Sequence, residues 1–309
     1  MTESTPATAV ATIGTFDGVH LGHRFLLERV VERARERGAR SLAVTFEPLP
    51  PQVLRPDRFQ GRLCTPEDKQ AVLLDAGIER VLVVPFDRAT AGLSPEAFVG
   101  DLASREGLVH LVVGDDFALG KDRVGDAARL AEIGRDLGFS VETVARIAVD
   151  GQEVSSSAIR AAIMRGDVAI ARTLLGRPFR VGGVVVHGRK LGRTIGFPTA
   201  NVEPPPDLAP LADGIYAAWA WLPGDAAPRP AITYVGNRPT VNTGPRVVET
   251  HILDFAGDLY GLELKADVLE RLRPDAHFPS LDALIAQMKI DEAAARAVLA
   301  REAAAVPGV

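Results

Sequence analysis

The feature that most constrains the fold is a series of short apolar runs in the first half of the chain. Each run is separated from the next by a segment with helix signals. Thr65-Pro66 and Ser94-Pro95 each place an N-cap and a proline at a helix start, and Gly77 follows the first of these helices. Strands that are apolar almost throughout and alternate with helices indicate a parallel sheet covered on both faces. The predicted strands are AVATIG (9–14), SLAVTF (41–46), ERVLVVPF (79–86), VHLVVG (109–114) and FSVETVA (139–145).

The second half of the chain has a different hydrophobic pattern. Its apolar runs are separated by Gly, Pro and Asn rather than by helices, and one long helical pattern, residues 280–305, closes the chain. This order predicts a small antiparallel barrel with a packed C-terminal helix. We place the domain boundary after a helical pair that ends near Gly176, which gives domains 1–176 and 177–309. The predicted strands are FRVGGVVVHG (179–188), GIYAAWAWL (214–222), RPAITYVG (229–236), RVVETHILDF (246–255) and LELKADVLE (262–270).

Bulk composition narrows the class of protein. A chain of 309 residues fits two domains, and its net charge of −5 predicts no polycationic surface for nucleic acid. No apolar run approaches the roughly 20 residues of a membrane span, and the N-terminus lacks the pattern of a signal peptide. The single cysteine, Cys64, rules out an intrachain disulfide. We therefore expect a cytoplasmic protein; composition leaves the oligomeric state open.

The stretch TFDGVHLGH, residues 15–23, lies where the first strand should give way to a helix. A helix that begins near His20 puts His20 and His23 on one face of its first turn, where free N–H groups attract phosphate. The glycines of the stretch and Gly14 allow a close approach of backbone to ligand. The alternative is that the histidines are ordinary capping residues. Two histidines without a third ligand nearby make a poor zinc site.

A second stretch, VSSSAIR at residues 154–160, has the same character. Three hydroxyls and Arg160 lie at a predicted helix start, and a guanidinium can hold phosphate with two hydrogen bonds. The alternative is a set of competing N-caps and a solvated arginine. Two helix N-termini that can bind anions, both in one parallel-sheet domain, favour the binding of a polyphosphate between them.

These two stretches resemble the HxGH and ISSTxxR motifs of the nucleotidyltransferase superfamily. Longer strings resemble, in order and over nearly the whole chain, the bacterial bifunctional riboflavin kinase/FMN adenylyltransferase family. The resemblance implies a Rossmann-like nucleotidyltransferase domain followed by a riboflavin-kinase barrel. It also implies the substrates riboflavin, FMN and ATP, the product FAD, and Mg²⁺ as cofactor. The strings include VTFEPLP, VVGDDFALG, GRTIGFPTAN, GNRPTVN, VVETHILDF and LRPDAHFPSLDALIAQM.

In the first domain the resemblance assigns residues to ATP and to the flavin. His20 and His23 would hold the ATP phosphates and stabilise charge in the transition state. Asp116 and Phe117, in VVGDDFALG, would contact the flavin. The remaining residues assigned to ATP are Gly14, Asp17, Ser155, Ser156, Ser157 and Arg160.

In the second domain, the resemblance implies the kinase reaction and assigns residues to it. Thr199 and Asn201 would hold Mg²⁺ and ATP, with Gly188 also at the nucleotide, although PTAN taken alone favours a turn. Glu249 would be the general base that takes the proton of the ribityl 5′-hydroxyl. On the predicted strand 246–255, Glu249 shares a face with Val, Leu and Phe side chains, so partial desolvation would raise its pKa. The alternative is a salt bridge with an arginine.

The chain also departs from the family pattern. Leu49 replaces a polar side chain, and Ala118 and Leu119 replace an Arg or Thr and an aromatic side chain. We expect these positions near the ligand, where they would affect FMN affinity. In the second half, Tyr234 and Asp275 replace an Asn or Ser and a Glu. Three hypotheses follow: a bifunctional enzyme, a kinase with a weakened adenylyltransferase half, and a flavin-binding regulator without turnover.

Overall fold

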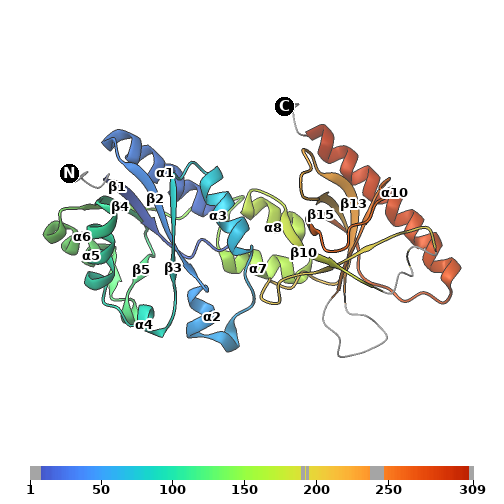
Figure 1. Ribbon diagram of the computed structural model, residues 1–309, viewed down its shortest axis with the longest axis horizontal. Helices are drawn as coiled ribbons and strands as arrows, with labels where there is room; N and C mark the ends of the chain where they lie inside the picture. The colour runs from blue at the N-terminus through green and yellow to red at the C-terminus, as the bar shows by residue number, and fades with distance from the viewer. Residues whose placement is uncertain (1–7, 189–191, 193–194, 237–246, 306–309) are drawn as a thin grey trace. The chain divides into compact units, whose positions relative to one another are not determined.

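The structure, a computed structural model, describes residues 8–188, 192, 195–236 and 247–305 (Figure 1). The string GNRPTVN therefore lies outside the described residues, apart from Gly236. Packing divides the chain into a first unit, Met1–Ser156, and a second unit, Ser157–Val309.

The first unit contains a five-stranded parallel sheet in the order β3-β2-β1-β4-β7. All five strands were predicted. The order reverses between β1 and β4, and ligands of such sheets bind beyond the carboxyl ends of the strands at this point. The strands are β1 (Ala9–Ile13), β2 (Arg40–Glu47), β3 (Arg80–Pro85), β4 (Leu108–Gly114) and β7 (Ser140–Val144).

Helices cover both faces of this sheet, as the apolar strands predicted. Ala9, Ala11 and Ile13 of β1 pack on one face with residues of α5 (Pro95–Glu106) and α6 (Ala127–Leu137). Val10 faces the other side, where it packs with residues of α1 (Leu21–Arg37) and α3 (Pro66–Asp75). The α/β class is thus confirmed, although α6 was not among the predicted helices.

Short elements, most of them at the carboxyl edge of the sheet, were not predicted. Each has only two to five residues, too few to give a periodic pattern. They are α2 (Pro50–Leu54), η1 (Pro56–Arg58), α4 (Arg88–Ala91), β5 (Ala118–Leu119), η2 (Lys121–Arg123), β6 (Gly125–Asp126), β8 (Ala148–Val149) and β9 (Gln152–Glu153). Two of them lie next to residues assigned to ligands by the resemblance: Asp116 and Phe117 come just before β5, and Ser155 follows two residues after β9.

The second unit contains a closed six-stranded antiparallel barrel in the order β10-β11-β14-β13-β12-β15. The barrel confirms the predicted class. One strand, β11, was missed, and β14 ends three residues before the predicted limit. The strands are β10 (Phe179–Val186), β11 (Ala200–Glu203), β12 (Gly214–Trp221), β13 (Arg229–Gly236), β14 (Val247–Ile252) and β15 (Glu263–Arg273).

The described residues of the second unit include the helices α7, α8 and α10. The C-terminal α10 (Leu281–Ala305) packs Ala295, Val298 and Leu299 against the barrel residues Ala217 and Leu269. Before the barrel, α7 (Ser156–Arg165) begins at the unit boundary, and α8 (Val168–Leu175) packs against β10 and β15. The packing boundary thus groups both helices with the barrel. The functional boundary after residue 176 stays a prediction.

Candidate active sites

The loop between β1 and α1 holds an unusual backbone conformation. Phe16, Gly18 and Val19 have φ of 46°, 81° and 39°, in the left-handed region. For a β-branched residue such as Val19 this conformation is strained, typically by about 1–3 kcal/mol, and such strain clusters at functional sites. Asp17 is buried between them and accepts a hydrogen bond from the Leu63 backbone N at 2.7 Å. The loop is therefore held by a contact 46 residues away in the chain.

The helix α1 begins directly after His20, as predicted, and His20 caps it, which is the role that the sequence left open as the alternative to phosphate binding. Its Nδ1 accepts a hydrogen bond from the His23 backbone N at 3.3 Å, and the two imidazole rings stack with centroids 3.6 Å apart. Because Nδ1 is the acceptor here, a neutral His20 carries its proton on Nε2. Gly22 permits this arrangement, since a Cβ on Gly22 would come 3.2 Å from His20 Nδ1. His20 is buried and His23 is half-buried.

The serine-rich stretch meets this loop within the first unit. Ser156 Oγ donates to the Asp17 carbonyl oxygen at 3.0 Å. The Val154 carbonyl oxygen is 3.7 Å from the Cβ that a side chain at Gly22 would have. Two stretches about 130 residues apart in sequence thus meet at one sheet edge. Ser157 and Arg160 follow on α7, in the second unit by the packing division.

The end of β4 supplies the next predicted residues. Phe117 is half-buried and packs against the sheet core, whereas the Asp116 side chain is 59% exposed. Arg146, just beyond β7, forms a salt bridge to Asp116 Oδ2 at 2.6 Å. No sequence pattern pointed to Arg146, because its partners lie in different segments.

A second set of predicted residues lies on the outside of the barrel. Glu249 of β14 is in register with Asn201 of β11 on one side and with Tyr234 of β13 on the other. Residues directly opposite on neighbouring strands have Cβ atoms about 5 Å apart, so these three side chains form one row. Thr199 Oγ1 donates to Glu249 Oε2 at 3.4 Å. A Cβ on Gly188 would collide with the Asn201 amide, so Gly188 also lies at this row.

The surroundings of Glu249 differ from the prediction. Val248 and Thr250, its neighbours along β14, are buried in the barrel, while Glu249 is half-buried on the outer face. The strand ends at Ile252 and Asp254 has a φ of 54°, so Leu253 and Phe255 do not extend the strand face. The prediction of one continuous apolar face around Glu249 is therefore wrong, because the chain turns earlier than its hydropathy indicates.

Two residues that depart from the family pattern contact each other. Tyr234 Oη donates to Asp275 Oδ2 at 3.0 Å, across 41 residues of sequence. Burial, followed by the Asp275 carboxylate, raises the pKa of Tyr234 well above its usual value; Asp213 and Glu249 contribute further. The Tyr234 hydroxyl is therefore a neutral donor next to the row that contains Glu249.

Comparison with known proteins shows the family of this chain. The FAD synthetase family model matches residues 2–158, and the riboflavin kinase family model matches residues 175–299. A bifunctional riboflavin kinase/FMN adenylyltransferase from Pseudomonas fluorescens is 43% identical over 296 residues, which cover 95% of this chain and 94% of the relative. The protein of that name from Escherichia coli K12 is 40% identical over 288 residues, which cover 93% and 91% of the two chains. The chain belongs to the bifunctional riboflavin kinase/FMN adenylyltransferase family.

One solved structure matches this family member over nearly its whole length. A crystal structure named as a macrolide-efflux protein from Streptococcus pneumoniae superposes with a TM-score of 0.86 at 30% identity, covering 95% of each chain. The name of that structure differs from the names of the relatives given above. A relative from Bacillus subtilis is 33% identical over 290 residues and is again named as the bifunctional enzyme.

The structure shows where the residues that depart from the family pattern lie in the first unit. Leu49 is 2% exposed, so its side chain is buried, as expected for an apolar side chain that gains free energy by leaving water. The neighbouring Glu47 instead carries polar contacts, with salt bridges to Arg62 at 2.8 Å and Lys69 at 2.7 Å. Ala118 and Leu119 are half-buried, and Leu119 packs against the sheet core.

The histidines outside the motifs are distributed between the two units. His110 of β4 is buried, with Nδ1 2.6 Å from Ser140 Oγ and Nε2 3.3 Å from Glu142 Oε2. Burial lowers the pKa of His110, and nearby Arg37 acts in the same direction. His251 Nδ1 lies 2.7 Å from the Pro198 carbonyl oxygen, just before Thr199. His187 and His277 are exposed.

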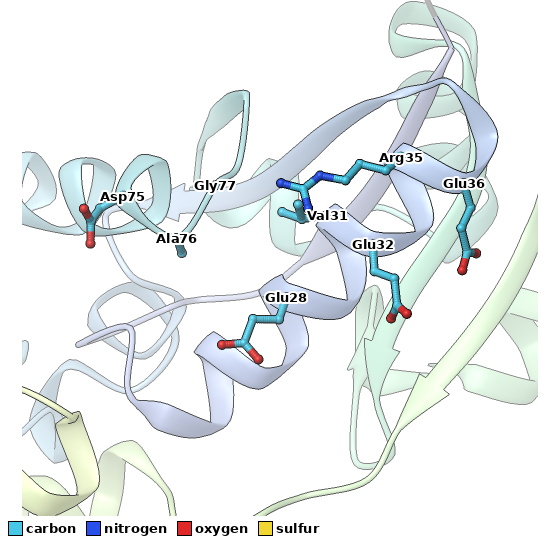
Figure 2. Close-up of a pocket in the computed structure, with 8 residues that line it drawn as sticks. All are labelled: Glu28, Val31, Glu32, Arg35, Glu36, Asp75, Ala76 and Gly77. Carbon is cyan, nitrogen blue, oxygen red and sulfur yellow. The ribbon is translucent and has the colours of Figure 1, made fainter.

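One open hollow of the first unit lies apart from these residues. It has a volume of about 500 Å³ and lies between α1 and the turn after α3 (Figure 2). Four carboxylates and a single arginine make it unsuitable for a polyphosphate. The residues that line it are Glu28, Val31, Glu32, Arg35, Glu36, Asp75, Ala76 and Gly77.

Neither a metal cluster nor a membrane-spanning helix is found in the part of the chain that the structure describes. There, no three His, Cys, Asp or Glu side chains converge as a metal site would require. Within the same residues, no helix is both long and apolar enough to cross a bilayer.

Proposed function

We propose that the two activities of the family are carried out by separate halves of this chain, divided near Gly176. The chain phosphorylates riboflavin to FMN with ATP, and it adenylylates FMN to FAD with release of pyrophosphate. The first half is assigned to adenylyl transfer and the second to phosphoryl transfer. The observation that carries this assignment is a meeting of predicted residues within each unit. Asp17, His20 and Ser156 meet at the β1–α1 loop of the first unit, and Asn201, Glu249 and Thr199 lie at the β11–β14–β13 row of the second.

In the adenylyltransferase site, His20 and His23 bind the ATP phosphates by donating hydrogen bonds. The Nε2 proton that the capping bond leaves on His20 supports this role, as does the free N–H array at the start of α1. Gly14 and Asp17 shape the strained loop, and Ser155, Ser156, Ser157 and Arg160 hold the polyphosphate from the second motif. Asp116 and Phe117 contact the flavin. The FMN phosphate is itself the nucleophile, so the protein supplies positioning and charge stabilisation.

In the kinase site, Thr199 and Asn201 bind Mg²⁺ and the ATP phosphates, with Gly188 against the nucleotide. The donor set fits this metal, since hydroxyl and amide oxygens beside a carboxylate are the hard ligands that Mg²⁺ prefers. When bound, Mg²⁺ neutralises charge on the transferred phosphoryl group. A side chain at position 188 would displace the Asn201 amide, which supports a role for that amide at the site.

Glu249 is the general base of the kinase site. Its place in the centre of the row lets it accept the proton of the ribityl 5′-hydroxyl while Thr199 orients one carboxylate oxygen. The hydroxyl oxygen then attacks the γ-phosphorus of ATP, and ADP leaves. The contact with Thr199 supports this role.

The direct test is to incubate the purified chain with riboflavin, ATP and Mg²⁺ and to separate the products by chromatography. Formation of both FMN and FAD supports the proposal. FMN without FAD would favour a kinase whose adenylyltransferase half is weakened. The absence of both products would favour a flavin-binding regulator without turnover.

Partners and location are proposed from composition. We propose small molecules as the partners of this chain, with no nucleic-acid partner, given its net charge of −5. A cytoplasmic location is proposed from the single cysteine and from the need for ATP.

A further inference from the structure

Arg146 lies at the carboxyl edge of the sheet, two residues beyond the end of β7. At this edge the β4–β5 loop, which contains Asp116 and Phe117, and the β8–β9 hairpin, which precedes Ser155, both leave the sheet. Neither composition nor any motif pointed to this arginine. Its importance comes from the three carboxylates that surround it.

The contacts of Arg146 join both segments. Its Nη2 is 2.6 Å from Asp116 Oδ2 and its Nε is 3.6 Å from Asp115 Oδ1, both in the loop after β4. Its Nη1 forms a short ion pair with Glu153 of β9. On the other side of the loop, Arg123 donates to the Asp116 carbonyl oxygen at 3.1 Å. One guanidinium thus links the segment assigned to the flavin with the segment assigned to ATP.

The charges at this place raise a problem for the reaction. With Arg123 included, three carboxylates and two guanidinium groups leave a net charge of −1 on these side chains, and without Arg146 the net charge is −2. FMN approaches with a phosphate close to a dianion, and ATP is more negative still. A carboxylate cluster repels both, and the side chains are about half exposed, so the repulsion is reduced by salt but not abolished.

We propose that Arg146 is a positioning residue of the adenylyltransferase site, which fixes the flavin loop to the β8–β9 hairpin and neutralises carboxylates that FMN would otherwise meet. The inference rests on the proposed assignment of Asp116 and Phe117 to the flavin. Exposed ion pairs contribute little to folding, typically 0–1 kcal/mol. Loss of Arg146 should therefore change FMN binding far more than stability.

The test measures FAD formation from supplied FMN by the full chain, with KM and kcat determined separately. Arg146→Leu should raise KM for FMN roughly tenfold at low salt, the scale of a dianion interacting with one charge in a solvent-exposed environment. The effect should shrink at high salt. Arg146→Lys, which keeps the charge but not the fork, should recover part of the loss. Arg146→Leu combined with Glu153→Gln should also recover part, because it removes one unneutralised carboxylate.

Arg129→Leu is the matched control. Arg129 is as exposed as Arg146 and faces two carboxylates, Glu96 and Glu132, but on the helices α5 and α6. It should leave KM for FMN unchanged, and riboflavin phosphorylation should be unchanged in every variant. If Arg146→Leu does not fold, Arg146→Gln provides the same charge change with better solubility.

Three results would overturn the inference. One is an unchanged KM for FMN in Arg146→Leu. Another is a lowered melting temperature with a fall in kcat that neither Arg146→Lys nor the Glu153→Gln combination reverses, which would indicate a purely structural role. The third is an effect of equal size in Arg129→Leu. Failure of the proposed function itself would look different, because the unmodified chain would then make FMN but no FAD.

Discussion

The two proposed sites differ in how they are built. The proposed site of the first unit consists of loops at the end of a parallel sheet, with strained backbone, a helix N-terminus and contacts between distant segments. The proposed site of the second unit is a row of side chains set by strand register on the outside of a barrel. Loops can present backbone N–H groups to a large polyphosphate, whereas rigid strands hold a base and its neighbours at fixed spacing.

This difference predicts how separable the two activities are. The barrel carries its own site, but its stability also depends on α8, which buries Val168, Leu174 and Leu175 among other residues. Burial of each such side chain contributes about 1.5–3 kcal/mol, so loss of all three approaches the total stability of a small domain. The helix α8 ends at Leu175, just before the predicted functional boundary.

The largest effect is therefore expected from truncation. A fragment of residues 157–309 should fold and phosphorylate riboflavin, whereas a fragment of residues 177–309 should be largely unfolded at 25 °C. Circular dichroism with thermal unfolding measures the fold, and FMN formation measures the activity. Equal stability of the two fragments would show that α8 is not part of the barrel unit and that the boundary near Gly176 is also a folding boundary.

A change in Glu249 tests the second site directly. Glu249→Gln keeps the shape and a hydrogen-bond acceptor but removes the basic oxygen, so riboflavin phosphorylation should fall by about 100- to 10,000-fold, the range of general base catalysis. Most of the remaining rate comes from positioning and the metal. FAD formation from supplied FMN should be unchanged, and rates at saturating riboflavin and ATP give the measurement.

Two controls make this result specific. Glu270→Gln changes an exposed glutamate of β15 that pairs with Arg301 away from the row, and it should have no effect on phosphorylation. Thr199→Ala should weaken ATP binding as well as turnover, because it removes a ligand oxygen. Near-normal phosphorylation by Glu249→Gln would mean that another group accepts the proton.

The matching change in the first site is His23→Ala. It removes a donor to the ATP phosphates, and FAD formation from FMN should fall roughly 100-fold or more, as for a lost oxyanion donor. Riboflavin phosphorylation in the same sample should be unaffected. An equal loss of both activities would contradict the assignment of separate sites. A bell-shaped pH profile that disappears with the histidine would indicate acid–base catalysis instead of phosphate binding.

The sequence predicted regular elements far better than it predicted the contacts between them. The apolar runs of the first sheet are long enough to identify each strand, but β11 begins at Ala200, directly after Pro198 and Thr199, which favour a turn. The early end of β14 was missed because Leu253 and Phe255 continue the apolar pattern beyond the strand. Hydropathy records which residues avoid water, and not where the backbone turns.

In the candidate sites, too, the sequence predicted local features better than contacts between distant residues. His20 and His23 could be placed from local spacing, because both belong to one helix turn. The pairing of Tyr234 with Asp275 could not, since the residues are 41 positions apart and meet only through the barrel. Arg146 is a similar case, as its carboxylates come from two different segments. Pairs of this kind depend on tertiary structure, which no local pattern encodes.

The smallest predicted effect concerns pH and again separates the two units. His110 is buried in the first sheet and its pKa is lowered by burial, so the folded chain disfavours its protonated form. The unfolded chain then binds more protons below a pH of about 6.5, and the stability of the first unit is complete above that value and falls as the pH drops toward the folded pKa. Glu142, whose pKa is lowered chiefly by Arg33, acts the same way at lower pH.

Denaturant unfolding of the full chain between pH 7.5 and pH 5.5, followed by probes of each unit, measures this difference. The histidines of the barrel unit, His187, His251 and His277, are exposed or half-buried, so the barrel should lose less stability over this range. His110→Gln removes the titrating group and retains hydrogen bonding to Ser140, so the pH slope of the first unit should flatten. The total loss of stability on acidification should shrink by at most about 1.4 kcal/mol for each pKa unit by which the folded and unfolded states differ. An unchanged slope in His110→Gln would mean that other groups dominate the acid sensitivity of the first unit. A steeper slope in the barrel than in the sheet would reverse the comparison from which this prediction starts.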